Sequence, residues 1–200
     1  MTTAPHNRPA IILASSSPFR RELLGRLQLP VDCQSPDIDE TGDSGESPWH
    51  LVRRLAEAKA MAIAGQCQAP TLVIGSDQVA VLDDVILGKP GDADNARQQL
   101  QRMRGCRIDF LTGLCLLNTQ TTSRQIDVIP YSVKFRDYDD AAIERYIAAE
   151  QPFNCAGSFR SEALGVTLLE SMSGSDPTAL IGLPLIRLCE MLRQEGQALP

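Results

Sequence analysis

Three consecutive serines and two adjacent arginines stand close together near the start of this 200-residue chain. Their sequence, S-S-S-P-F-R-R, covers residues 15–21 and follows the apolar run 10–14, which predicts a strand buried on both faces. Pro18 suits the first turn of a helix, so Arg20 and Arg21 are expected at a helix N-terminus, where the backbone already carries partial positive charge. Hydroxyls, N–H groups and guanidiniums gathered there suit a polyphosphate, although two solvated arginines explain the pattern equally well.

A lysine interrupts the apolar stripe of the next predicted helix, which begins at Ser47-Pro48 and ends at Gly65. The positions that share one face of this helix are Val52, Leu55, Ala56, Lys59 and Ile63. An ammonium on such a stripe is unfavourable unless it reaches solvent or meets an anion. Snorkelling to solvent is the commoner outcome, and Lys59 paired with an anion is the alternative.

Three carboxylates and a second lysine complete the set of candidate residues. Asp77 follows the apolar run 71–75, which predicts another buried strand. Functional groups collect at the carboxyl ends of strands in open α/β sheets, so Asp77 is a candidate metal ligand or general base, with a turn-forming aspartate as the equal alternative. Asp39 and Glu40 offer the hard oxygen ligands that Mg²⁺ prefers, or else form an exposed acidic loop. Lys89 stands in the restrained turn G-K-P, where a surface lysine is the ordinary explanation.

The composition argues against several classes of function. Lys and Arg total 19 against 25 Asp and Glu, a formal net charge of -6, which does not suit a nucleic-acid polymer as partner. No apolar run reaches the length of a membrane span and no signal peptide is evident, so we expect a cytoplasmic protein without a membrane partner. The six cysteines form no C-x-x-C pair, and we expect most of them to be small core residues. Neither phosphate-binding glycine motif, G-x-x-x-x-G-K-[ST] or G-x-G-x-x-G, occurs.

Helices and strands alternate along the rest of the chain, which predicts an α/β fold with a mixed sheet. We expect a hairpin at Asp83-Asp84 and strands over 107–117, over 126–136 and from Gly165 to Met172. Helices are expected from a cap at Asp92 to Arg104, with Gly105 terminating it, over about 139–149, and from a cap at Asp176 to about Gly196. Because no linker or repeat divides the chain, we expect one domain over residues 10–196 after a loose tail, residues 1–9.

The order of the candidate motifs resembles the Maf family. The matching segments are A-S-S-S-P-F-R-R-E-L-L at 14–24, D-E at 39–40, R-L-A-x-x-K-A at 54–60, G-S-D-Q at 75–78, G-K-P at 88–90 and G-L-P-L at 182–185. Within the family, S-P-F-R-R, G-S-D-Q-V, A-G-S-F at 156–159 and S-E at 161–162 look like the YceF-like branch, which hydrolyses 7-methyl-GTP. The resemblance implies an elongated mixed sheet with flanking helices, like that of the inosine-triphosphate pyrophosphatases, and a cleft between two lobes.

The resemblance also implies a role for each candidate residue. The family's phosphate-binding positions match Ser15, Arg20 and Arg21. Its polar catalytic positions match Glu40, Lys59, Asp77 and Lys89. Asp77 is the expected proton acceptor, and Asp77 with Glu40 is expected to bind Mg²⁺ or Mn²⁺. The expected reaction is attack of water at the α-phosphorus of a nucleoside triphosphate, which yields a monophosphate and pyrophosphate.

The positions that separate the family's branches by substrate match Phe19, Gln78 and Glu162. The pyrimidine-acting branch has Arg in place of Phe19 and commonly Thr in place of Gln78, which argues against dTTP and UTP. Because 7-methylguanine carries a delocalised positive charge, we expect it to stack on Phe19 and to donate hydrogen bonds to Glu162, with Gln78 at another base edge. The alternative is that Phe19 belongs to the core with Leu23 and Leu27.

Two other functions stay open on the sequence. One is a dTTP/UTP pyrophosphatase of the sister branch, and the other is a regulator of cell division that only senses a nucleotide. A homodimer is consistent with the family resemblance, and the expected partner is otherwise a small-molecule nucleotide.

Overall fold

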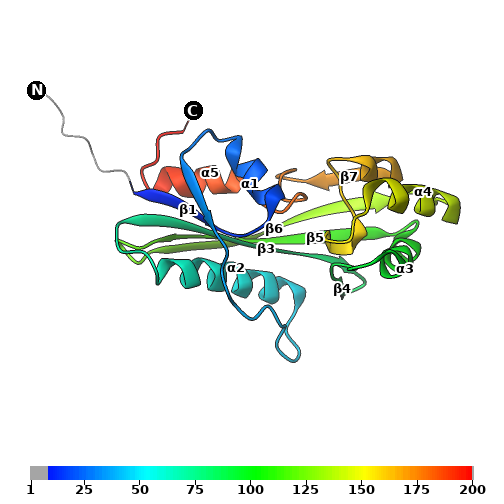
Figure 1. Cartoon of the computed structure of the whole chain (residues 1–200), viewed down its shortest axis with the longest axis horizontal. Coiled ribbons are helices and arrows are strands. Elements are labelled where there is room, and N and C mark those ends of the chain that lie inside the picture. The colour runs from blue at the N-terminus through cyan, green and yellow to red at the C-terminus, as the bar shows by residue number, and fades with distance from the viewer. Residues whose placement is uncertain (1–8, 200) are drawn as a thin grey trace, which may run out of the picture.

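A long mixed β-sheet runs through the whole molecule (Figure 1). In this computed structural model, which describes residues 9–199, its strands are β1 (Ala10–Ala14), β2 (Val31–Gln34), β3 (Thr71–Leu82), β4 (Val85–Leu87), β5 (Arg107–Asn118), β6 (Arg124–Phe135) and β7 (Leu169–Gly174). Their order is β2-β1-β3-β5-β6-β7, and β4 pairs with β3. β1 is parallel to β2 and β3, whereas β5 and β6 pair antiparallel with their neighbours. The predicted mixed α/β fold is confirmed.

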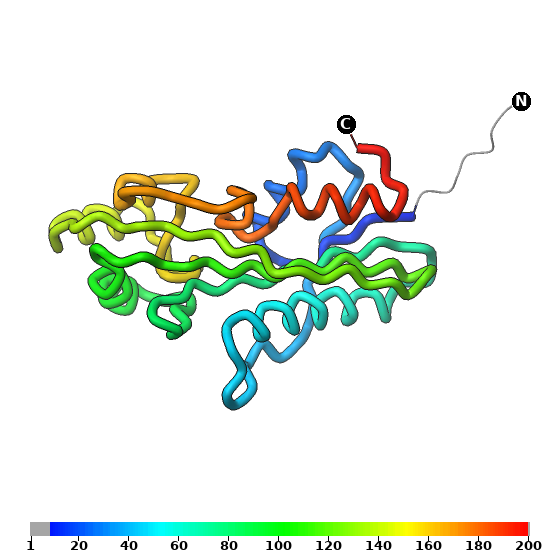
Figure 2. The backbone as a smooth tube through the Cα atoms, turned by 180° about the vertical axis from the view of Figure 1, so that it is seen from behind, coloured from blue at the N-terminus to red at the C-terminus, as the bar shows by residue number. Residues whose placement is uncertain are grey.

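The helices divide between the two ends of the sheet. They are α1 (Pro18–Gly25), α2 (Pro48–Ala64), α3 (Ala93–Met103), α4 (Asp140–Glu150) and α5 (Leu185–Gln194), with short 3-10 turns η1 (Ala156–Ser158) and η2 (Leu164–Leu168). At one end, α1 and α5 lie on one face of the sheet and α2 on the other, while α3, α4 and β7 gather at the opposite end (Figures 1 and 2). The long strands β3, β5 and β6 run through both halves, which gives the molecule the elongated, two-lobed shape expected from the sequence.

Buried apolar side chains form separate clusters on the two faces of the sheet. The largest cluster joins α1, α3, α4 and α5 to one face and contains Leu23, Phe110 and Phe135. Two smaller clusters lie where α2 packs on the sheet, one around Ala60 and one around Leu55. The predicted apolar stripe of α2 is thereby confirmed. Within the described part of the chain, none of the helices combines the length and the apolar character that crossing a membrane requires.

Most helix starts follow the local signals in the sequence. The hydroxyl of Ser17 accepts a hydrogen bond from the backbone of Arg20 and caps α1, and Ser47 caps α2 in the same way. The side chains of Asp92 and Asp139 cap α3 and α4. These caps confirm the predicted starts, because capping depends on residues that are neighbours in the sequence.

Several element predictions were wrong. The strand β2 was not predicted, although V-D-C-Q alternates apolar and polar residues at an edge of the sheet. The strand expected from Gly165 begins only at Leu169, because residues 164–168 form the turn η2. The expectation that most cysteines belong to the core is confirmed, since Cys115 is buried in it and three half-buried cysteines, Cys33, Cys67 and Cys106, pack against it. Residues 1–8 of the expected loose tail lie outside the described residues.

The prediction that Asp176 is the N-cap of the last helix was also wrong, since α5 begins at Leu185 after Pro184. Asp176 nevertheless binds a backbone N–H group at the start of α5, although it lies outside the helix. The buried carboxylate of Asp176 accepts a hydrogen bond of 2.8 Å from the backbone N–H of Ile186, in the first turn of α5. The segment between Asp176 and the helix is therefore folded back on itself.

Candidate active site

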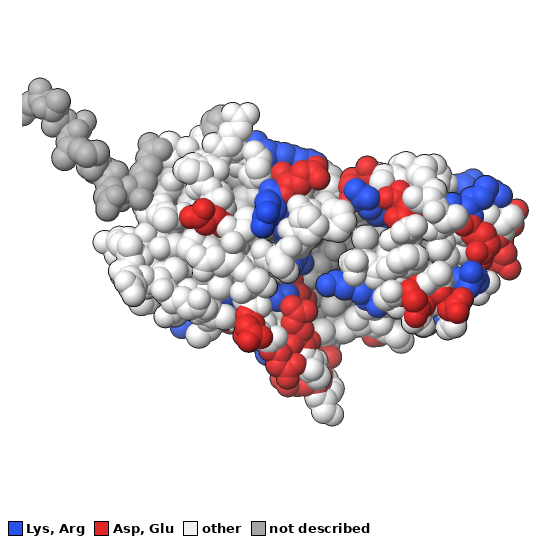
Figure 3. Space-filling model, viewed as in Figure 1, with Lys and Arg blue, Asp and Glu red and all other residues white. Residues whose placement is uncertain are grey.

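The site lies at a gap along one edge of β3. β1 pairs with this edge as far as Gly75, and β4 pairs with it again from Ala80. Residues 76–79 have no strand partner on that edge among the described residues. Figure 3 shows that this side of the molecule is hollowed between its two halves and that acidic and basic side chains gather at the hollow. The cleft expected from the sequence therefore opens where the sheet is interrupted.

Asp77 lies within the gap, but not at the end of a strand as predicted. β3 continues to Leu82, because β5 stays paired with it through Val81 and holds the backbone extended. What ends beside Asp77 is the parallel pairing with β1, whose last residue, Ala14, lies opposite Gly75. Asp77 therefore lies beside the carboxyl end of β1, at the edge where open α/β sheets collect functional groups, but β3 is longer than predicted.

Lys59 binds two carboxylates in the gap. Its Nζ lies 2.6 Å from Oδ1 of Asp77 and 2.7 Å from Oε1 of Glu40. The side chains of Lys59 and Asp77 are 6% and 11% exposed, whereas that of Glu40 is 56% exposed. Snorkelling to solvent is therefore excluded, and the ammonium on the apolar stripe of α2 meets an anion.

Two glycines bring α2 close enough to the sheet for this contact. A Cβ added to Gly75 would lie 2.1 Å from the carbonyl oxygen of Ala56, and one added to Gly113 would lie 2.1 Å from that of Val52. No side chain fits at either position, so the helix backbone lies directly on β3 and β5. This close packing explains how Lys59, in the middle of α2, reaches Asp77 in the middle of β3.

Arg20 is fixed at the other side of the gap. Its Nε donates a hydrogen bond of 2.8 Å to the carbonyl oxygen of Gly182, and its Nη1 lies 3.4 Å from Oγ of Ser15. Burial lowers the pKa of the Arg20 guanidinium, while the nearby carboxylates of Asp77 and Glu40 act in the opposite direction. Arg20 stays charged, since arginine keeps its proton in proteins, and its remaining N–H groups are available for an anion.

Arg21 does not join this cluster as predicted. Its side chain is exposed, and no hydrogen bond or ion pair within residues 9–199 links it to the cluster. Successive residues of a helix point in directions about 100° apart, so only one of two adjacent arginines in α1 can face the gap. Arg20 takes that position.

Lys89 approaches the cluster from the other half of the molecule. Burial acts to raise the pKa of Glu40, but the hydrogen bond from Lys59 and the charges of Lys59, Lys89 and Arg20 outweigh it, and this pKa is lowered. Lys89 itself is exposed and follows β4. The predicted residues Glu40, Lys59 and Asp77 are thus in contact, and Lys89 acts on Glu40 through its charge without an ion pair to it.

The loop that carries Glu40 is held by an arginine that the sequence reasoning did not single out. Arg54 of α2 donates to both carboxylate oxygens of Glu46, at 2.8 and 2.7 Å, and to the carbonyl oxygen of Thr41 at 3.0 Å. The bidentate pair closes the loop between Glu40 and α2. Arg54 lies inside the motif R-L-A-x-x-K-A, which is the signal that could have identified it.

Gln78 is placed differently from its predicted role at a base edge. Its Nε2 donates to the carbonyl oxygens of Ala179 and Leu180, at 2.7 and 3.1 Å, and to Oγ1 of Thr112 at 3.0 Å. These acceptors use the two N–H donors of the amide. Gln78 therefore ties the segment 176–184, which supplies the carbonyl group that binds Arg20, to β3.

Ser76, which was not predicted, has a related position. Its Oγ lies 2.9 Å from the carbonyl oxygens of both Gly113 and Gly182. Gly182 has a φ of 116°, a backbone conformation that favours glycine. The carbonyl group of Gly182 is thus held between Ser76 and Arg20.

Phe19 is not part of the core. It is half-buried and belongs to none of the three apolar clusters that the described residues form. The guanidinium of Arg160 covers its ring, with Cζ 5.2 Å from the ring centroid, and Nε of Arg160 donates a hydrogen bond of 3.1 Å to Glu162. Phe19 and Glu162 are therefore joined through Arg160, which stands between the motifs A-G-S-F and S-E and was not predicted.

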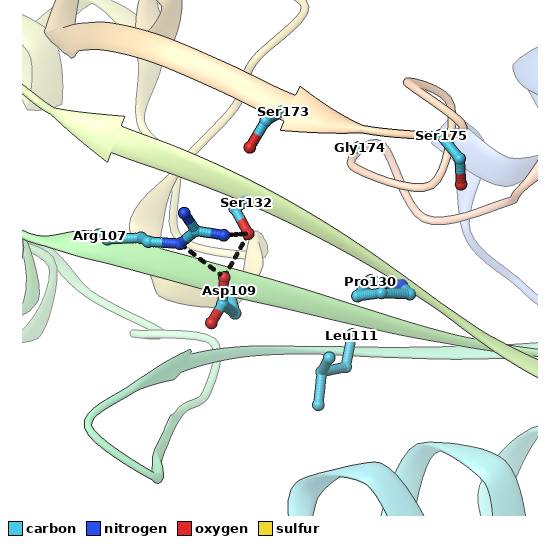
Figure 4. Close-up of a pocket in the computed structure, with 8 residues that line it drawn as sticks. All are labelled: Arg107, Asp109, Leu111, Pro130, Ser132, Ser173, Gly174 and Ser175. Carbon is cyan, nitrogen blue, oxygen red and sulfur yellow. Dashed lines mark hydrogen bonds and ion pairs between the residues drawn. The ribbon is translucent and has the colours of Figure 1, made fainter.

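Two open cavities of the molecule do not include Asp77 in their lining. One of about 410 Å³ is bounded by β5, β6 and β7, where Arg107, Asp109 and Ser132 bind one another (Figure 4). Another, of about 260 Å³, lies beside Lys89 and α3. The first contains none of the predicted residues. The candidate site is therefore defined by converging charges, not by the size of a cavity.

Comparison with known proteins shows the family to which the chain belongs. Residues 10–195 match the family model described as Maf-like protein, so the chain belongs to the Maf family. A protein of Pseudomonas syringae pv. tomato named 7-methyl-GTP pyrophosphatase is 56% identical over 96% of this chain and 100% of its own length. One of Methylobacillus flagellatus with the same name is 55% identical over 94% of this chain and 97% of its own.

Similarity to solved structures is more distant. A HAM1 protein from Coxiella burnetii has a TM-score of 0.45 and 18% identity, covering 65% of this chain and 74% of that one. A dITP/XTP pyrophosphatase from Mycobacterium abscessus has a TM-score of 0.41 and 15% identity, covering 64% and 75%.

Proposed function

We propose that this protein is a nucleoside-triphosphate pyrophosphatase that hydrolyses 7-methyl-GTP to 7-methyl-GMP and pyrophosphate and so removes a modified nucleotide. The observation that carries this proposal is the contact of the buried Lys59 with Asp77 and Glu40, two carboxylates whose charges also act on the guanidinium of Arg20. Fixed cations beside carboxylates suit a triphosphate that must be bound and attacked by water. The names of the relatives at 53–57% identity support the choice of 7-methyl-GTP.

In the proposed reaction, Asp77 accepts a proton from a water molecule as the water oxygen bonds to the α-phosphorus. The bond between the α-phosphorus and the bridging oxygen breaks, and pyrophosphate leaves. Arg20 and Lys89, on opposite sides of the gap, stabilise negative charge on the phosphoryl oxygens. Lys59 orients the carboxylate of Asp77 through its 2.6 Å contact.

Asp77 and Glu40 fit a divalent cation, Mg²⁺ or Mn²⁺. One oxygen of each carboxylate contacts the ammonium of Lys59, and the other oxygen of each would bind the cation. Residues 9–199 contain no group of three or more His, Cys, Asp and Glu side chains suited to a metal, so phosphate oxygens and water would complete the coordination. When bound, such a cation neutralises the triphosphate and polarises its phosphoryl oxygens.

The selectivity for a modified purine belongs to the same proposal. Phe19 and Glu162 supply an aromatic ring and a carboxylate, the two groups that suit a cationic base. A cytoplasmic location is proposed on the basis of six free cysteines, and a homodimer on the family resemblance alone.

The test is release of pyrophosphate by the purified protein with Mg²⁺ from 7-methyl-GTP, GTP, dTTP and UTP. We expect 7-methyl-GTP to have the highest kcat/KM, and Asp77→Asn to lower turnover on the order of 100-fold or more in a folded protein. Preference for dTTP or UTP would support the sister-branch activity. Tight binding of 7-methyl-GTP without pyrophosphate release would support a nucleotide sensor.

A further inference from the structure

One cation of the protein already fills the place where the base of the substrate is expected. The Arg160 guanidinium lies over the ring of Phe19, 5.2 Å from its centroid, and its Nε is 3.1 Å from Oε1 of Glu162. Its other arm reaches Glu150 at the end of α4, with Nη1 2.8 Å from Oε1. Arg160 therefore uses the aromatic face and the carboxylate at the same time.

The guanidinium and 7-methylguanine share the features that these two groups recognise. Both are planar and positively charged, and both present adjacent N–H donors along one edge. A guanidinium meets an aromatic face through a cation–π contact and a carboxylate through charge-assisted hydrogen bonds, and a cationic purine can do the same. In this geometry the ring of Phe19 and the carboxylate of Glu162 cannot bind Arg160 and a cationic base at the same time.

We propose that Arg160 is a specificity-determining residue that occupies the base subsite of the free protein and yields Phe19 and Glu162 to the cationic base when the nucleotide binds. This inference rests on the proposed function, because it names the chemistry of the base that the site accepts. A cation replaces a cation, so the charge around Glu162 is balanced in both states.

Glu150 provides the place to which Arg160 withdraws. Its side chain is 8% exposed, and its second oxygen accepts a hydrogen bond of 3.1 Å from the backbone of Leu164. The backbone N–H of Arg160 donates to the hydroxyl of Tyr146 at 3.1 Å, which fixes the main chain. The side chain can therefore exchange one carboxylate contact while its backbone and its contact with Glu150 remain.

The experiment measures the Kd of 7-methyl-GMP by calorimetry in the wild type, in Glu150→Gln and in the double variant Glu150→Gln with Arg160→Gln. In Glu150→Gln the displaced side chain of Arg160 has no carboxylate to bind, so the Kd of 7-methyl-GMP should rise. Arg160→Gln on that background removes the competing cation without leaving a buried carboxylate unpaired. It should lower the Kd about threefold to tenfold relative to Glu150→Gln, the size expected from one cation–π contact.

Inorganic pyrophosphate serves as the control ligand, because it has no base, and its Kd should be the same in both variants at equal thermal stability. An unchanged or higher Kd of 7-methyl-GMP on adding Arg160→Gln overturns the proposal, as does an absence of binding by all three proteins. Pyrophosphate release from 7-methyl-GTP by the wild type is measured in parallel. Release together with an unchanged Kd rejects the role of Arg160 and leaves the proposed function in place, whereas its absence rejects the function.

Discussion

Gly113 of β5 lies directly opposite Asp77 of β3, and the backbone of α2 rests on it. The glycine thus sets the distance between the helix that carries Lys59 and the strand that carries Asp77. A side chain there would have to push α2 away, because the carbonyl oxygen of Val52 lies 2.1 Å from the position of a Cβ. The geometry of the charged cluster depends on a residue that contributes no functional group.

Gly113→Ala should therefore lower both stability and activity. Overpacking of this kind costs about 1–3 kcal/mol, and separating Lys59 from Asp77 should lower kcat on the order of 10-fold or more. Thermal unfolding and pyrophosphate release are the measurements. Gly25→Ala is the matched control, because a Cβ at Gly25 meets no atom within 4 Å. Equal behaviour of the two variants would contradict the proposed spacing role.

Arg54→Lys should lower kcat/KM on the order of 10-fold, because lysine cannot reproduce the bidentate contact that holds the loop of Glu40. Arg53→Lys, on the exposed side of the same helix, is the control. If Arg54 acts through Glu40, the effect should disappear when Glu40→Gln is already present. A loss of the same size in both backgrounds would show a role independent of Glu40.

Lys89→Ala should raise the pKa of Glu40. The charge of Lys89 helps to hold this pKa below its ordinary value of 4.5. The ionised carboxylate of Glu40 therefore stabilises the fold at a pH above 4.5. This contribution to the free energy of unfolding is lost as the pH falls through the lowered pKa. It is small, because the side chain is 56% exposed. An NMR titration of Glu40 is the measurement, with Arg102→Ala as the control. An unchanged midpoint in Lys89→Ala would separate Lys89 from the cluster.

Phe19→Arg and Gln78→Thr should have different effects on substrate choice. Phe19→Arg removes the aromatic face and should lower kcat/KM for 7-methyl-GTP on the order of 10-fold, with little change for UTP. Gln78→Thr removes hydrogen bonds to the segment that binds Arg20, so both substrates should lose activity. A selective loss of 7-methyl-GTP activity in Gln78→Thr would restore its predicted role at the base.

The parts of the site that the sequence predicted are those set by local chemistry. The serine cap of α1 and the lysine on the stripe of α2 could be identified because neighbouring residues determine helix starts and helix faces. The full length of β3 could not, because it depends on pairing with β5, some 35 residues away in the sequence.

Two of the missed contacts join distant segments of the chain. Arg20 meets the carbonyl group of Gly182 across a separation of 162 residues, and nothing local to either residue indicates this. Arg160 reaches Phe19 in the same way. The partner of Gln78 could not be predicted for another reason. A side-chain amide can bind a substrate or a backbone carbonyl group equally well, and its position beside Asp77 does not distinguish the two.

The most direct test of the account is hydrolysis of 7-methyl-GTP in water enriched in oxygen-18, followed by mass spectrometry of the products. Attack of water at the α-phosphorus places the label in 7-methyl-GMP and leaves the pyrophosphate unlabelled, which is the result that we expect. Label in pyrophosphate, or 7-methyl-GDP with labelled orthophosphate as the primary products, would contradict the assignment of the cluster around Asp77.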